Sequence, residues 1–336
     1  MEDDIQRYVK LNTDCFNLNK IDIHAHLNGS IRRSTLNELL SNNDKEEFCN
    51  IGMPTTLQNC FDMFRISSKI LTDLNIVRRI TREVLEDWKN QNCIYFELRT
   101  TPKAIGDKNK TDYINVILEE INESNNKYLM KTRLILCIDR AHPLKDAEEL
   151  YDIYTKLNSP YKNLIVGVDY SGNEDKEHIP HNDLFVVLNK FRSAGLGITY
   201  HIGEIEKYKM LDFTVFKPDR ISHTFYLNDD DVKKIIEFKI PVEICPTSTL
   251  VNFKKYKYSD IHFKYYFDKT KEVNLVSINT DDTMLFSTNI CQEFFEIAMS
   301  HDLDVNDLKN ILRNTVSFIF DKSEMLRKEL IDKIDR

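Results

Sequence analysis

Short strand patterns alternate with helical patterns along almost the whole chain. Alternation of this kind predicts parallel strands joined by helical crossovers. Eight such units closed into a ring form an α/β fold, the (β/α)8 TIM barrel. An open doubly wound sheet is the alternative, but no Gly-x-Gly-x-x-Gly turn follows the first strand, which disfavours a dinucleotide fold. The expected strands are Lys20–His26, Cys93–Arg99, Thr132–Ile138, Asn163–Asp169, Leu196–Tyr200, Arg220–His223, Val242–Cys245 and Asn274–Asn279.

The segment between the first two strands is longer than an ordinary crossover. Residues 41–54 contain Asn-Asn-Asp and Gly-Met-Pro and are expected to be irregular. Thr55–Ile66 has apolar residues at helical spacing. The excursion is interpreted either as a helical lid over a substrate or as an insertion that only packs. The other expected helices are 1–18, 34–40, 75–88, 112–122, 145–157, 183–194, 207–216, 229–238 and the region 290–334.

Composition narrows the class of protein. The 336 residues are 41% hydrophobic and show no repeat or linker, which predicts a single domain over 1–336. The net charge of −8 is mixed along the chain, which argues against nucleic-acid and membrane partners. The acidic start has no apolar stretch, so we expect no signal peptide. Seven scattered cysteines favour a reducing compartment, and we expect a cytoplasmic monomer.

The first strand ends in a His-x-His pair. Residues i and i+2 of a strand point to the same side, so His24 and His26 project together. Two imidazoles on one side can bind a metal such as zinc. Alone, the pair is weak evidence, because surface and core histidines occur at the same spacing.

Further polar residues lie at the ends of later strands. In a barrel the carboxyl ends of all strands face one mouth, so side chains far apart in sequence converge there. Each has a structural alternative: a strand-end histidine, a solvated loop charge or a helix N-cap. Together, three histidines and an aspartate form a plausible catalytic zinc site with a water in the open position. The polar residues expected at the strand ends are His24, His26, His201, Glu204, His223, Asp281 and Asp282.

These motifs resemble the adenosine deaminase family, in the same order and over nearly the whole chain. The resemblance implies a TIM barrel of the metal-dependent amidohydrolase type, with a helical lid after the first strand. Cys60–Phe64 and Glu97–Lys103 resemble the adenosine deaminase-like branch, whose members act on N6-methyl-AMP. The motifs that carry the family resemblance are His24–Ser30, His201–Glu204, Arg220–His223, Cys245–Ser248 and Asn279–Asp282.

The resemblance also implies roles. One Zn²⁺ per chain would be held by His24, His26, His201 and Asp281. Glu204 would donate a proton to purine N1, and His223 would orient and deprotonate the water. Asp282 would bond N7 and the Gly172 backbone would meet N3. The remaining substrate contacts, shared in part with the metal, would be His26, Asn28, Ser68, Thr100, Thr101, Pro102, Lys103 and Asp139.

Asn28 bears on the 5′ end of the substrate. Adenosine-specific relatives usually carry aspartate here, which accepts a hydrogen bond from the 5′-hydroxyl. A carboxylate would oppose a phosphate, whereas an asparagine amide can donate to it. Lys103, Thr100 and Thr101 could meet the same phosphate. We therefore expect a purine nucleoside monophosphate as substrate, with N6-methyl-AMP converted to IMP and methylamine. One alternative is that Asn28 only shapes a turn. The other is that the enzyme deaminates free adenosine.

Four positions depart from the family pattern. Glycine usually flanks the His223 equivalent, but this chain has Ser222 and Thr224. Tyr170 stands where leucine is usual and is expected to narrow or restack the site. Ser68 stands where the branch often has a lid histidine. These changes put the local shape of the pocket in question and leave the metal ligands in place.

Two other readings remain. A two-metal amidohydrolase usually needs a carboxylated lysine or a glutamate at the end of the fourth strand, and Val168-Asp169-Tyr170 offers no lysine. The Pro-Cys-x-x-Cys deaminase architecture lacks its second cysteine here. A non-catalytic barrel is the alternative from another class, and loss of a ligand would favour it. None of the expected ligands is missing.

Overall fold

The protein is seen in a computed structural model that describes residues 2–177, 179–252, 257–270 and 274–336. Within these residues eight strands form one parallel sheet in chain order, each hydrogen-bonded to the next. The strands are β1 (Lys20–His26), β2 (Cys93–Thr100), β3 (Lys131–Asp139), β4 (Ile165–Ser171), β5 (Gly197–Ile202), β6 (Arg220–His223), β7 (Val242–Ile244) and β8 (Val276–Ile278).

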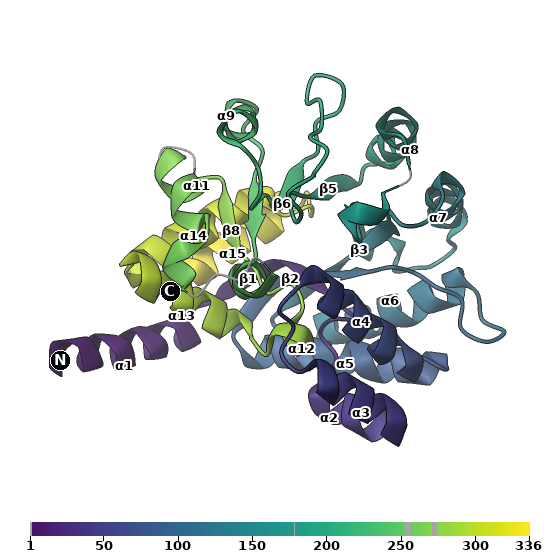
Figure 1. The fold of residues 1–336 in the computed structure, drawn as a ribbon, viewed down its shortest axis with the longest axis horizontal. Helices are drawn as coiled ribbons and strands as arrows, with labels where there is room; N and C mark the ends of the chain where they lie inside the picture. Colours follow the sequence, from purple (N-terminus) through teal and green to yellow (C-terminus); the bar gives the residue numbers. More distant parts are fainter. Residues whose placement is uncertain (1, 178, 253–256, 271–273) are drawn as a thin grey trace.

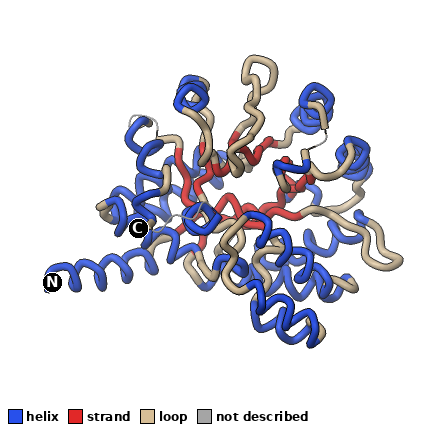
Figure 2. The backbone as a smooth tube through the Cα atoms, in the orientation of Figure 1, coloured by secondary structure: helices blue, strands red, loops and turns tan. Residues whose placement is uncertain are grey.

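The sheet nearly closes on itself between β8 and β1. Beyond β8, Asp281 forms a parallel bridge with Ala25 of β1. The His26 N–H donates to the Asp281 carbonyl at 3.0 Å, and the Asp281 N–H donates to the His24 carbonyl at 2.9 Å. Figure 2 shows the strands as a ring surrounded by helices. The predicted (β/α)8 barrel is confirmed.

Helices cover the outside of this ring, and α1 projects away from it at the N-terminal end (Figure 1). Short 3-10 helices are η1 (Ser68–Ile70), η2 (Lys162–Leu164), η3 (Glu174–Lys176) and η4 (Tyr258–Asp260). The α-helices are α1 (Glu2–Asn17), α2 (Arg33–Leu39), α3 (Asn42–Ile51), α4 (Leu57–Ser67), α5 (Leu74–Asn90), α6 (Lys110–Lys127), α7 (Leu144–Lys156), α8 (His181–Ser193), α9 (Asp229–Glu237), α10 (Pro246–Asn252), α11 (Phe263–Lys269), α12 (Thr283–Phe286), α13 (Ile290–His301), α14 (Val305–Phe318) and α15 (Glu324–Asp335).

Helix α5 illustrates how the outer layer packs. Asp73 caps its start, since the Asp73 side chain accepts from the N–H groups of Asn75 and Ile76. Its buried apolar residues recur every three or four positions and face the sheet. Trp88 stacks on Phe96 of β2 with ring centroids 4.7 Å apart. The amphipathic pattern in the sequence therefore predicts this helix correctly.

Two expectations for the connecting segments are wrong. Residues 41–54 are not irregular: α3 occupies most of them, because the Ser41 side chain accepts from the Asp44 N–H and caps the helix. Residues 207–216 are not helical within the described structure. Leu211, Phe213 and Phe216 are buried in an irregular segment instead, and Phe216 stacks on Phe185 of α8 with ring centroids 4.6 Å apart. Tertiary packing overrides the local pattern here. The helices α10, α11 and α12 were not expected.

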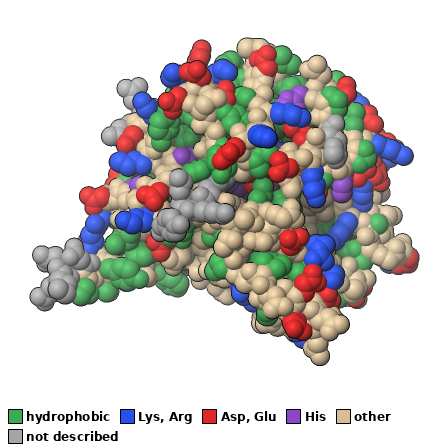
Figure 3. Space-filling view, in the orientation of Figure 1, with side chains coloured by type: hydrophobic (Ala, Val, Ile, Leu, Met, Phe, Trp, Pro, Cys, Tyr) green, Lys and Arg blue, Asp and Glu red, His purple; other side chains and the backbone are tan. Residues whose placement is uncertain are grey.

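The surface carries charges of both signs. Acidic and basic side chains are intermixed on the face in Figure 3. No described helix is both long and apolar enough to cross a membrane.

Candidate active site

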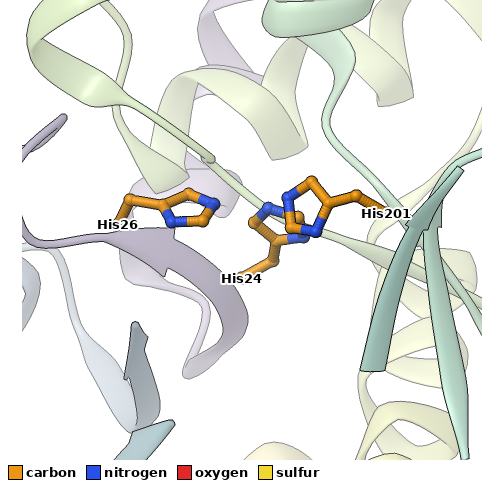
Figure 4. Close-up of side chains that lie close together, drawn as sticks. All are labelled: His24, His26 and His201. Carbon is orange, nitrogen blue, oxygen red and sulfur yellow. The ribbon is translucent and has the colours of Figure 1, made fainter. Parts of the chain in front are cut away.

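Three histidines and an aspartate converge at the carboxyl ends of the strands. The ring nitrogens of His24, His26 and His201 include ligand atoms within 4.8 Å of one another, although β1 and β5 lie on opposite sides of the ring (Figure 4). Asp281 joins them from the closure of the barrel. Its Oδ1 lies 3.4 Å from Nε2 of His24 and 3.6 Å from Nε2 of His26. The structure thus brings together all four expected metal ligands.

The hydrogen bonds behind these histidines fit a metal. Nδ1 of His24 lies 2.8 Å from Glu243 Oε2, and Nδ1 of His201 lies 2.9 Å from Asp169 Oδ1. A carboxylate behind an imidazole fixes the tautomer and leaves Nε2 free for a metal. Nε2 of His24 is buried with no hydrogen-bond partner among the described residues. Imidazole nitrogens and carboxylate oxygens are donors that bind metals such as zinc.

Buried arginines keep the two supporting carboxylates charged. The guanidinium of Arg99 lies 3.3 Å from Asp169 and also contacts Glu243. Nε of Arg220 lies 2.7 Å from Glu243 on its other side. Burial alone would raise the pKa of Glu243, but the charges of Arg99 and Arg220 hold that pKa well below its usual value. The histidines therefore face acceptors that stay ionised.

Glu204 lies two residues beyond the end of β5, and its surroundings raise the pKa of its side chain. Its side chain is 10% exposed. Burial, followed by the neighbouring carboxylates of Glu174 and Asp281, raises the pKa of Glu204 well above its usual value. Nε2 of His223 lies 3.8 Å from Oε1 of Glu204. A carboxyl group whose raised pKa favours its protonated form thus lies beside an imidazole at the mouth of the barrel.

His223 sits in a strained turn at the end of β6. It has φ 65°, and the next residue, Thr224, has φ 60°. Left-handed backbone is uncommon for non-glycine residues and costs free energy, especially for a β-branched side chain. Burial lowers the pKa of His223 well below its usual value, which favours the neutral form of the ring. Such strain often accompanies a functional position.

A cavity of about 490 Å³ opens onto these groups. Its size is in the range of small-molecule sites. Helix α4 and η1 form one wall, so the segment after β1 does more than pack: it covers the cavity with Phe61 and Phe64. The expected residues that line the cavity are His26, Asn28, Ser68, Thr100, Thr101, Asp139, Gly172, His201, Glu204, Asp281 and Asp282.

Two glycines leave room for carboxylates beside the cavity. A Cβ on Gly29 would lie 1.7 Å from Oδ1 of Asp282, and a Cβ on Gly172 would lie 2.3 Å from Oδ1 of Asp139. Gly172 also has φ +96°, which favours glycine. Oδ1 of Asp282 is buried with no partner among the described residues. A ligand in the cavity can therefore reach an unpaired carboxyl oxygen.

Two expected contacts lie apart from this cavity. Pro102 and Lys103 follow β2 and are absent from the cavity lining among the described residues. Burial lowers the pKa of Lys103 to about 8. A cationic amine of lowered pKa fits a phosphate contact less well than a fully charged one, so the contribution of Lys103 stays a prediction.

Comparison with known proteins identifies the group to which this barrel belongs. The family model described as adenosine deaminase matches residues 19–336. The chain belongs to the adenosine deaminase family. This membership confirms the interpretation of the chain as a hydrolytic deaminase, and the family is metal-dependent.

Individual relatives align over almost their full length. An Arabidopsis thaliana protein named N6-mAMP deaminase is 32% identical, covering 92% of this chain and 94% of the relative. A Clostridium kluyveri adenosine deaminase is 30% identical, with 93% and 94% covered. The crystal structure of Arabidopsis ADAL complexed with IMP superposes with a TM-score of 0.84 at 29% identity, covering 96% of this chain and 97% of that one.

The departures from the adenosine deaminase pattern lie mostly behind the site. The expectation that Tyr170 narrows or restacks the pocket is wrong: its ring packs against Tyr200 at 4.9 Å, away from the cavity. The hydroxyl of Ser222 donates to Glu243. Thr224 Oγ1 lies 3.2 Å from Nε2 of His262, which also contacts the His223 carbonyl. Side-chain contacts therefore support the turn that glycines usually form in this family.

Sequence reasoning missed functional candidates of two kinds. Arg65 of α4 and Lys176 of η3 line the cavity as cations, and nothing in the local pattern marks them. Glu243, the acceptor behind His24, did leave a signal. A carboxylate in the middle of a short apolar strand must find buried partners, and Arg220 and Arg99, likewise on strands, are such partners.

Proposed function

We propose that this chain is a zinc-dependent deaminase of a purine nucleoside 5′-monophosphate, with N6-methyl-AMP and water giving IMP and methylamine. The observation that carries the proposal is the convergence of three histidines, Asp281 and a buried Glu204 beside one cavity. The relative named N6-mAMP deaminase and the IMP complex of Arabidopsis ADAL support the choice of substrate.

The residues of this chain would share the chemistry as follows. Zinc held by His24, His26, His201 and Asp281 would supply a Lewis acid that makes water nucleophilic at neutral pH. His223 takes a proton from the attacking water while the oxygen bonds to purine C6. Protonation of N1 must accompany this attack so that charge does not build on the ring.

Glu204 would provide that proton to N1, which its raised pKa favours. The C6–N bond then breaks as the departing amine takes the proton held by His223. The C6 hydroxyl returns a proton to Glu204 as it becomes the carbonyl of IMP. The Asp282 carboxyl meets N7 and the backbone of Gly172 meets N3, which fixes the purine plane. Asp139 lines the same cavity and limits the space around Gly172.

The wall around Asn28 favours a phosphate at the 5′ end. Oδ1 of Asn28 is buried without a partner among the described residues. Because the oxygen and nitrogen of an amide are assigned from their contacts, the same position can present the N–H₂ group to an anion. Arg65 and Lys176 line the cavity and bring positive charge, and Thr100, Thr101 and Ser68 bring hydroxyls.

Deamination of free adenosine is the second candidate. The Clostridium kluyveri adenosine deaminase is almost as similar to this chain as the N6-mAMP deaminase is. Arg65 is also paired with Glu47 at 2.5 Å, which offsets part of its charge. With a nucleoside as substrate, the 5′-hydroxyl would lie beside Asn28 in place of a phosphate.

One assay separates these candidates. Ammonia and methylamine release is measured with adenosine, AMP and N6-methyl-AMP, alongside the zinc content of the purified protein. We expect one zinc per chain and the highest kcat/KM with N6-methyl-AMP. Equal kcat/KM for adenosine would reject the nucleotide preference, and absence of zinc would reject the metal assignment. We further propose a cytoplasmic monomer, for which the unpaired state of all seven cysteines is favourable.

A further inference from the structure

The segment that carries Glu204 is held by one carboxylate, together with the Tyr226 N–H, which donates to the Gly203 carbonyl at 3.0 Å. Three consecutive backbone N–H groups donate to Glu174: Gly203 at 3.1 Å, Glu204 at 2.8 Å and Ile205 at 3.1 Å. Successive N–H groups that point to one spot form an anion-binding concavity. Here the anion is a side chain of the same protein, 5% exposed and delivered by η3.

Regular structure does not hold this segment. Strand β5 ends at Ile202, and the chain from Gly203 to the start of β6 at Arg220 is irregular, as the long loop at the top of Figure 2 shows. A helix after β5 would have ordered these N–H groups at its first turn. Without such a helix, the Glu204 N–H donates to the Glu174 side chain, and this contact restrains the backbone of Glu204.

Arg140 fixes Glu174 from the other side. Its Nη1 lies 3.3 Å from Glu174 Oε1, and its Nη2 donates to the His201 carbonyl at 2.7 Å. The guanidinium stacks against the rings of Tyr170 and Tyr200 at 4.9 and 5.6 Å. The buried ion pair between Arg140 and Glu174 therefore contacts the backbone of His201 through Arg140 and the backbone of Glu204 through Glu174.

We propose that Glu174, held by Arg140, is a positioning residue for the acid Glu204. The inference rests on the proposed function, in which Glu204 donates to N1. Glu174 places the Glu204 backbone for this transfer through three hydrogen bonds. After burial, the neighbouring carboxylate of Glu174 is the largest cause that raises the pKa of Glu204, while burial raises the pKa of Glu174 as well.

The chain offers a matched control in Glu177. It is buried to a similar degree, 6% exposed, and belongs to the same cluster, where it accepts from the hydroxyls of Tyr170 and Tyr200. Within the described residues, Glu177 accepts no hydrogen bond from the backbone of 203–205. Glu174→Gln and Glu177→Gln remove the same charge from neighbouring positions, and only the first weakens the contact with Glu204.

The test compares kcat, KM, zinc content and Tm of the two variants on N6-methyl-AMP. Misplacement of a reacting group by ~1 Å can cost about 100-fold. We expect Glu174→Gln to lower kcat by roughly 10- to 100-fold, with KM within about twofold and zinc retained. We expect less than about a twofold change in kcat for Glu177→Gln at a comparable Tm. Glu174→Asp keeps the charge and should restore part of kcat.

Equal kcat in the two glutamine variants would overturn the inference, and so would a loss that appears only in KM. If Glu174→Gln does not fold, Glu174→Asp and Glu177→Asp replace the pair, with the same expected order. Glu204→Gln separates this inference from its premise. Undiminished kcat in Glu204→Gln would reject the proposed role of Glu204; a large loss there, with no difference between the Glu174 and Glu177 variants, would reject only the role of Glu174.

Discussion

The residues proposed to bind the metal and the residue proposed to donate the proton are held in place by different means. His24 and His26 stand on β1, and Asp281 is tied to that strand by backbone hydrogen bonds at 2.9 and 3.0 Å. Glu204 stands in an irregular segment, fixed by a side chain 30 residues away in sequence. The difference teaches that ladder hydrogen bonds place the metal ligands as the barrel closes. The acid depends in addition on one buried ion pair.

Removal of a metal ligand should have the largest effect. His201→Ala takes one imidazole from the cluster, and the expected result is loss of zinc and of all measurable activity together, because three remaining ligands bind far more weakly. Zinc per chain and kcat are measured on the same preparation. His181→Ala is the control, since His181 contacts Glu177 outside the metal cluster. Full zinc occupancy in His201→Ala would sink the ligand assignment.

Removal of the acid should leave the metal half intact. Glu204→Gln is expected to keep zinc and substrate binding and to lower kcat by ~10²–10⁴-fold, the usual range for a general acid. Because the protonated form acts, wild-type kcat/KM should fall as pH rises through the raised pKa of Glu204. Exposed Glu206→Gln is the control. A loss confined to KM would mean that Glu204 only binds the ground state.

A charge placed at the 5′ end should act on substrate choice alone. Asn28→Asp sets a carboxylate where the phosphate is expected, and at ~4 Å each charge pair costs roughly 4 kcal/mol at an effective dielectric near 20. We expect the ratio of kcat/KM for N6-methyl-AMP to that for adenosine to fall by roughly 100-fold or more. Asn252→Asp adds the same charge elsewhere in the cavity. An equal drop in that variant would contradict a specific role for Asn28.

The lid arginine should give the smallest change. Arg65→Met removes a cation from the cavity wall, and a hydrogen bond to a charged group is worth about 1.5 kcal/mol or more, so the same ratio should fall about 10-fold. Lys69→Met is the matched control, because Lys69 pairs with Asp44 and Glu47 and lies outside the cavity lining described for this site. Identical ratios in both variants would show that Arg65 does not meet the phosphate.

Local pattern was enough for the strands and most helices. Period-two runs ending in polar residues predicted the eight strands, and residues i and i+2 share a face by geometry alone, which placed His24 beside His26. It failed where packing or capping competes with the pattern. Ser41 and Asp44 start α3 in a run that looked irregular, and burial of Phe213 and Phe216 keeps 207–216 from forming a helix.

The sequence by itself determined the barrel, because strand periodicity carries that information. Motifs at the strand ends predicted the residues proposed as metal ligands, and the family resemblance predicted the residue proposed as the acid. Only the tertiary structure decided which side chains support them. Tyr170 packs against Tyr200, Arg65 lines the cavity from α4, and Glu174 accepts a hydrogen bond from the Glu204 N–H. Such contacts join residues far apart in the chain, and their distances are set only when the whole ring of strands and loops is packed.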